Sequence, residues 1–146
     1  MKIVSSLALV VAIGSMSGCA TSPQQITSVP LNATMSNPGR IAEATLTPMG
    51  NETDLWLFVS GVPIQTTFPA RLYTYVYSGS CGSLGAKPAY DLNQTVNTEY
   101  YSPGSGIHLR KSVPVAYDTL RSGGYAVVVR GSPTDGGHEL FCGKLG

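Results

Sequence analysis

Cysteine and histidine are the residue types in this chain best suited to chemistry, and both are scarce. The 146 residues hold three cysteines, at 19, 81 and 142, and two histidines, His108 and His138. A catalytic copper or zinc centre built mainly from imidazoles needs more of them than that. The sequence also lacks the GxSxG, HExxH, GxxxxGK[ST] and GxGxxG motifs. We therefore expect no bound metal, no cofactor and no enzymatic activity.

The first cysteine, Cys19, ends a segment that is typical of an export signal. Lys2 supplies a positive charge, residues 3–13 are almost all apolar, and the small residues Ser17 and Gly18 directly precede the cysteine. A helix that rises 1.5 Å per residue would carry this apolar run only about 17 Å, short of a ~30 Å hydrocarbon core. A permanent membrane-spanning helix is therefore not expected here.

The residues around the cysteine resemble the lipobox of bacterial lipoproteins, in which the cysteine is acylated and becomes the new N-terminus. Met16 stands where that motif usually has Leu, so ordinary cleavage after Ala20 is the alternative. The resemblance implies a signal peptide over residues 1–18 and a lipid on Cys19 that holds the protein to a membrane. Because the residue after the cysteine is not Asp, it further implies the bacterial outer membrane, on its periplasmic or its surface face.

Residues 19–40 are expected to form a lipidated flexible tether. From Thr21 onward this segment has three prolines, and it carries no charge before Arg40. Such a composition buries too little apolar surface to offset the entropy lost on ordering. Val29 and Leu31 could still dock as an extended edge segment. The folded domain is then expected over residues 41–146.

The composition of this domain predicts an all-β fold. The whole chain has 17 glycines and 10 prolines, only 12% charged residues, and a net charge of +1, which excludes the basic surface that nucleic-acid binding needs. Apolar runs bounded by turn residues predict seven short antiparallel strands in a β-sandwich or barrel. These runs are residues 41–47, 55–62, 70–78, 89–92, 113–117, 125–130 and 139–143.

Tyrosines provide the candidate binding residues. In residues 71–77 the alternation places Tyr73, Tyr75 and Tyr77 on one face of a strand, and Tyr100 and Tyr101 follow further along the chain. Tyrosine rings are rigid and amphipathic, so they suit contacts with an envelope protein or a glycan. The alternative is that about half of them fill the sandwich.

Cys81 and Cys142 form an even pair once Cys19 is processed. In an exported protein such a pair predicts a structural disulfide, with free thiols, a metal site and a redox pair as the alternatives. In the chain-entropy model, closing a loop of about 60 residues stabilises a protein by roughly 4 kcal/mol.

Segments around these two cysteines resemble the disulfide segments of copper,zinc superoxide dismutases. They are GSCG at residues 79–82 and the terminal CGKLG at residues 142–146. Residues 118–130 look like the late strand of the related chordin-type (CHRD) domains, and residues 42–63 look like their opening hairpin. The resemblance implies an eight-stranded Greek-key sandwich, with one edge strand besides the seven predicted above.

The metal ligands of the dismutases are missing. Tyr75 and Tyr77 stand at the positions of their His-x-His pair, Arg130 at a late-strand histidine, and Glu139 at the arginine that guides the substrate anion. We therefore expect a non-enzymatic bacterial cell-envelope lipoprotein that acts as a surface or periplasmic binding or structural module. The alternative is a copper-handling or redox relative of the dismutase fold.

Overall fold

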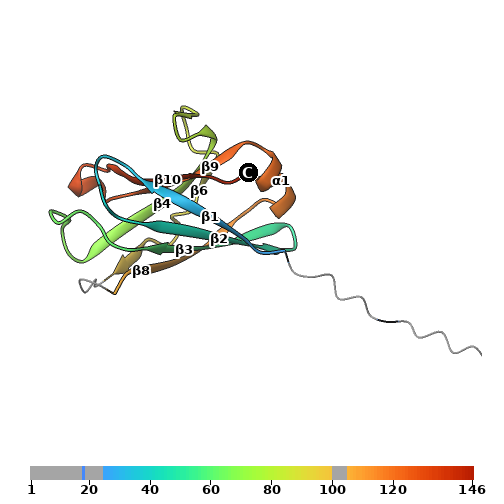
Figure 1. Cartoon of the computed structure of the whole chain (residues 1–146), viewed down its shortest axis with the longest axis horizontal. Helices are drawn as coiled ribbons and strands as arrows, with labels where there is room; N and C mark the ends of the chain where they lie inside the picture. The colour runs from blue at the N-terminus through green and yellow to red at the C-terminus, as the bar shows by residue number, and fades with distance from the viewer. Residues whose placement is uncertain (1–17, 19–24, 100–104) are drawn as a thin grey trace, which may run out of the picture.

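A computed structural model describes residue 18, residues 25–99 and residues 105–146 of the chain (Figure 1). The predicted lipidation site Cys19 and the candidate binding residues Tyr100 and Tyr101 lie outside these residues.

The described residues form ten strands, one short α-helix and one 3₁₀ helix, which confirms the predicted all-β fold. In chain order the elements are β1 (Thr27–Ala33), β2 (Ala42–Met49), β3 (Glu52–Val59), β4 (Ala70–Ser80), β5 (Ser83–Leu84), β6 (Tyr90–Asp91), β7 (Asn97–Glu99), β8 (Ile107–Val113), α1 (Tyr117–Ser122), β9 (Tyr125–Arg130), η1 (Pro133–Asp135) and β10 (Glu139–Lys144).

The strands form one antiparallel sheet that curls into two facing halves. We call β1–β2–β3–β8 the first sheet and β4–β9–β10 the second sheet; the short strands β5, β6 and β7 pair with the outer edge of β4. Strand β1 joins the halves, because its first part pairs with β2 and its last two residues pair with β10, and Figure 1 shows it crossing between them. The spatial order of the main strands is therefore β4–β9–β10–β1–β2–β3–β8, so the last strand of the chain, β10, pairs with the first, β1.

The hydrophobic core lies between the two halves. Alternate residues of each strand point inward, as period-two patterning requires, and Leu55, Leu57, Val76, Val129 and Phe141 are almost completely buried there. The helix α1 contacts β2, β3 and β9. Removal of this apolar surface from water is the main source of stability for the fold.

The predicted tether is wrong for Thr27–Ala33, and the folded domain begins well before Ile41. Val29 and Leu31 alternate with exposed residues and are buried at 7% and 4% exposure, so the segment does dock, but between two strands rather than at an edge. Gly143 of β10 allows β1 to lie this close to β10, because a Cβ atom at Gly143 would lie only 2.3 Å from the Leu31 side chain.

Strand β9 begins and ends at the predicted residues, whereas the predicted strand at residues 113–117 is wrong. The strand there is β8, which ends at Val113, and Tyr117 begins the helix α1. The alternation of apolar and polar residues along β8 is broken in the sequence, because Lys111 occupies one of the inward positions.

Side chains close the seam on the side where the two sheets do not pair. The Asn93 amide group accepts a hydrogen bond from Thr74 N at 2.8 Å and donates one to Thr74 O at 3.0 Å, as a neighbouring strand would. On β8, the Lys111 ammonium group donates to Thr95 O at 2.8 Å. An inward-pointing lysine on an edge strand discourages pairing with another chain.

We expect Lys111→Met to raise the free energy of unfolding at pH 7. Burial lowers the pKa of Lys111, and Asp91 only partly opposes this. The folded state therefore holds the lysine proton less tightly than the unfolded chain, and the resulting cost disappears as the pH rises toward the unfolded value of about 10.4. Urea denaturation at pH 7 and pH 10 should show the advantage of the variant shrinking. An advantage that does not change with pH would contradict this role of the charge.

Candidate binding surface at the loop end

The tyrosine stripe lies on the outer face of the second sheet. Tyr77 is buried in a small cluster with Val128 and Cys142 that is separate from the main core, while Tyr73 and Tyr75 are half-buried. The predicted alternation along β4 is therefore confirmed. Burial, with Asp91 as the next cause, raises the pKa of Tyr75, so its hydroxyl stays protonated at neutral pH.

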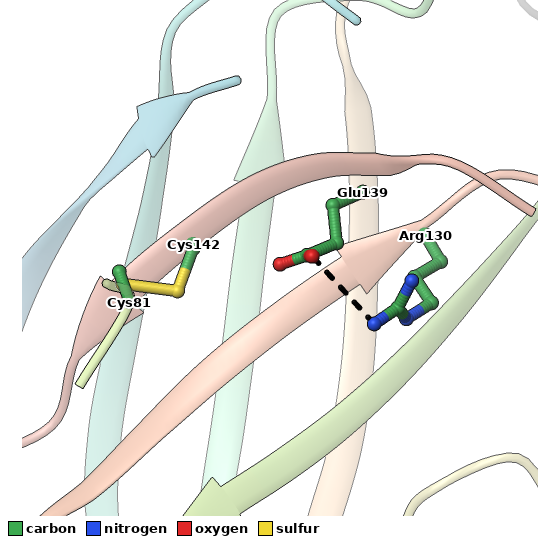
Figure 2. Close-up of a disulfide and its surroundings, with 4 residues drawn as sticks. All are labelled: Cys81, Arg130, Glu139 and Cys142. Carbon is green, nitrogen blue, oxygen red and sulfur yellow. Dashed lines mark ion pairs between the residues drawn. A yellow bond between two sulfur atoms is a disulfide. The ribbon is translucent and has the colours of Figure 1, made fainter. Parts of the chain in front are cut away.

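Arg130 and Glu139 lie on this same face (Figure 2). The Arg130 Nη2 and Glu139 Oε2 atoms are 3.7 Å apart, and the guanidinium group lies 5.9 Å from the centroid of the Tyr77 ring. Both charges are partly screened by solvent, so the pair is a weak stabilising contact. Arg130 and Glu139 are therefore paired with each other and Tyr77 is packed in its cluster, while an open hollow of about 730 Å³ lies beside Arg130 and Glu139.

The predicted disulfide is confirmed. Cys81 and Cys142, separated by 61 residues, are bonded and join the turn after β4 to β10 (Figure 2). The turn needs glycine at Gly79, which has φ of 101° and whose Cβ would lie 2.2 Å from Ser83 O. The bond therefore fixes the end of β4 against the last strand of the sheet.

The two histidines lie in different parts of the fold. His108 is on the outer face of β8, where its ring lies 5.2 Å from that of Phe58. His138 lies in the loop between β9 and β10. Within residues 25–99 and 105–146 no three His, Cys, Asp or Glu side chains come together as a metal site would require.

A hollow lies at one end of the sandwich, among three loops. These are residues 34–41 between β1 and β2, residues 60–69 between β3 and β4, and residues 131–138 between β9 and β10; we call them together the loop end. The hollow has a volume of about 440 Å³, within the range of ligand sites. Its lining includes the apolar residues Met35, Pro38, Val62, Pro63, Ile64 and Leu140.

Exposed apolar side chains gather around this hollow. Met35 is 93% exposed and Ile64 is 92% exposed, and both line it. Ile41, at 68%, and Phe68, at 53%, belong to the same loops. Exposed apolar residues that gather in one place, unlike scattered ones, are typical of interaction surfaces.

Hydrogen bonds hold the three loops in place. Buried Asn37 donates from Nδ2 to Gly61 O at 3.1 Å, which joins the first loop to the second. The Asp135 carboxylate accepts from Thr67 N at 3.2 Å and from Thr67 Oγ1 at 2.6 Å, which joins the second loop to the third. The loop end is therefore formed before any ligand binds.

Two charged side chains, Asp135 and Arg40, line the hollow. The Asp135 carboxylate accepts hydrogen bonds from Thr67 N and Thr67 Oγ1. The ion pairs in the described part of the chain are Arg110–Asp54 and Arg130–Glu139, so the Arg40 guanidinium group belongs to neither. The hollow is therefore lined by one positive group, Arg40, and one negative group, Asp135.

Trp56, the single tryptophan of the chain, is a weaker candidate for a binding residue. It lies half-exposed on the outer face of the first sheet, where its Nε1 donates to Asp54 at 2.8 Å. The Arg110 guanidinium group stacks over the ring at 5.2 Å. The polar edge and one face of the indole are thus already occupied within the protein.

Sequence reasoning missed the loop end. Met35 and Ile64 stand alone in segments rich in Pro, Gly and polar residues, where single apolar side chains are common on ordinary surfaces. The nearest sequence signal is a proline close to each, Pro38 three residues after Met35 and Pro63 directly before Ile64.

Comparisons of this chain with protein families, with curated proteins and with solved structures found no match. None of the described helices is long and apolar enough to cross a bilayer.

Proposed function

We propose that this protein is a non-enzymatic lipoprotein of the bacterial cell envelope that binds an envelope component through the loop end. The observation that carries the proposal is the hollow of about 440 Å³ with Met35 and Ile64 standing exposed at its margin. The antiparallel β fold and the Cys81–Cys142 disulfide are compatible with descent from the superoxide dismutase-like or CHRD sandwich, in which case other residues occupy the ligand positions.

The position of the loop end relative to the N-terminal segment supports this proposal. Strand β1 begins at Thr27, which pairs with Leu46, and runs to the loop end, where Leu31 pairs with Ala42. Seven residues of strand span about 20 Å. A chain anchored through Cys19 therefore enters the domain at one end and presents its binding loops at the other.

Cys19→Ser should move the protein from the membrane fraction to the soluble fraction. The physical reason is that two or three acyl chains, at about 0.8 kcal/mol per buried CH₂, hold a protein to a bilayer almost permanently. Detergent-phase partitioning of both chains measures the effect, with Cys81→Ser as the matched cysteine substitution that should stay membrane-bound. Unchanged partitioning of Cys19→Ser would contradict the lipid anchor.

Site-specific photo-cross-linking tests the binding surface. A photoreactive side chain in place of Ile64 should form an adduct with an envelope component, whether protein, glycan or lipid. The control position is Met49, which is 54% exposed but ends β2 at the hairpin on the opposite end of the sandwich. The proposal fails if Ile64 gives no adduct, or if both positions give adducts in equal yield.

A further inference from the structure

We propose that the Cys81–Cys142 bond is a thiol–disulfide exchange site, which a dithiol reduces while the domain stays folded, and that its reduction releases the hairpin after β4. This inference does not depend on the loop end or on what binds there. Three observations carry it: the exposure of one of the two cysteines, the hollow in front of the bond, and the few other contacts that hold the hairpin.

The two cysteines of the bond differ in exposure. Cys81 lies in the turn after β4 and is exposed, whereas Cys142 in β10 is 5% exposed and packs in the cluster of Tyr77. Both cysteines line the open hollow of about 730 Å³ beside Arg130 and Glu139. Access to the sulfur atoms is one of the factors that set the rate of thiol–disulfide exchange, and exposed disulfides are typically the labile ones. A thiolate can therefore reach the Cys81 sulfur from the hollow without prior unfolding.

The hairpin that carries Cys81 has few other contacts with the domain. Residues 79–88 are all exposed except Leu84, which is half-buried, and Figure 1 shows this segment projecting from the sheets. Strand β9 pairs with β4 only as far as Ser78, and one further hydrogen bond runs from Gly79 N to Gly124 O at 2.7 Å. The disulfide is therefore the strongest constraint on this hairpin, and breaking it should free the hairpin and leave the core in place.

The exchange proceeds in two steps. A thiolate of the dithiol attacks the Cys81 sulfur, the bond between Cys81 and Cys142 breaks, and Cys142 leaves as a thiolate that takes up a proton. The second thiol of the dithiol loses its proton and attacks the reductant sulfur that is bound to Cys81, so that Cys81 leaves as a thiolate and is protonated in turn. Two electrons and two protons thus pass to the protein, and the dithiol becomes a disulfide.

Reduction kinetics in urea test whether the domain stays folded. The full chain in detergent is treated with dithiothreitol below the unfolding transition, and iodoacetamide followed by mass spectrometry measures the free Cys81 and Cys142 thiols. Attack on the folded state should give a rate that is proportional to the dithiothreitol concentration and changes by less than about twofold per molar urea. A rate that rises at least about fivefold per molar urea would mean that global unfolding comes first, and would overturn the proposal.

Glutathione, a monothiol, identifies the sulfur that is attacked. Iodoacetamide traps the intermediate, because it alkylates the departing thiol before that thiol can reverse the reaction. We expect glutathione on Cys81 and the alkyl group on Cys142. The opposite distribution, or equal amounts of the two products, would show that the exposure of Cys81 does not direct the exchange, and the proposed site would be wrong.

Hydrogen exchange of the reduced protein, kept in dithiothreitol, tests the release of the hairpin. The amides of Gly79 and Gly85, which donate to Gly124 O and Ser78 O, should lose protection. The amides of β9, which pairs with β4 and β10, should keep theirs. Unchanged protection at Gly79 and Gly85 would contradict the release, and loss of protection throughout β9 would show that the bond holds the whole domain rather than the hairpin.

Discussion

The double variant Cys81→Ala, Cys142→Ala should unfold with a free energy about 4 kcal/mol lower than that of the disulfide-bonded protein. The bond closes a loop between residues 61 positions apart. The unfolded chain with the disulfide therefore has a lower conformational entropy than the unfolded chain without it, which favours the folded state. A typical domain is stable by only about 5–15 kcal/mol, so this is a large fraction of the total. Urea denaturation of both chains under non-reducing conditions measures the difference.

Chemical reduction of the unaltered protein is the matched control for that variant, because it breaks the same bond without changing a residue. It should lower the unfolding free energy by a similar amount. If neither the double variant nor reduction shifts the urea midpoint, the disulfide does not contribute to stability and the account of the second sheet is wrong.

Leu31→Ala should cost about 3 kcal/mol of stability. Leu31 is 4% exposed in the core, on the strand that joins the two sheets, and its truncation leaves a cavity between them. The control is Ile26→Ala, one residue before the strand, where a 61% exposed side chain should change stability by less than about 0.5 kcal/mol. Equally small effects at both positions would restore the prediction that residues 19–40 form a tether.

Local patterns were sufficient to predict much of the fold. Strand β9 is a run of apolar residues between Gly124 and Gly131, and β4 alternates tyrosines with buried residues, so both could be located from sequence. The disulfide followed from cysteine number and the export signal. Each of these features depends on neighbouring residues or on residue type alone.

The parts that were missed depend on partners distant in sequence. Strand β1 has a polar, proline-containing sequence and is held between β2 and β10, where Asn32 pairs with Cys142, 110 positions later. The loop end is built from three loops that the fold brings together, so no single segment carries its signature. Lys111 hid the pattern of β8, because a buried lysine requires a partner such as Thr95 O that the sequence does not reveal.

The sequence and the structure favour different candidate binding surfaces, and the tyrosines stay a prediction. Tyr73, Tyr75 and Tyr77 do share one outer face, as predicted. Their rings are half-buried or buried, and Arg130 and the disulfide occupy the surface beside them. Alternation identifies which residues share a face, but not how deeply neighbouring strands cover it.

Methionine oxidation in intact cells tests the loop end as the binding surface most directly, because the protein contains its own control. Met35 lies at the loop end and is 93% exposed, and Met49 lies at the opposite end and is 54% exposed. Hydrogen peroxide converts each thioether to a sulfoxide, and mass spectrometry gives the two rates. In the purified protein Met35 should oxidise faster than Met49. In the intact envelope the ratio of the Met35 rate to the Met49 rate should fall at least about fivefold, because the loop end is covered. A ratio that is the same in the envelope and in the purified protein would contradict the account.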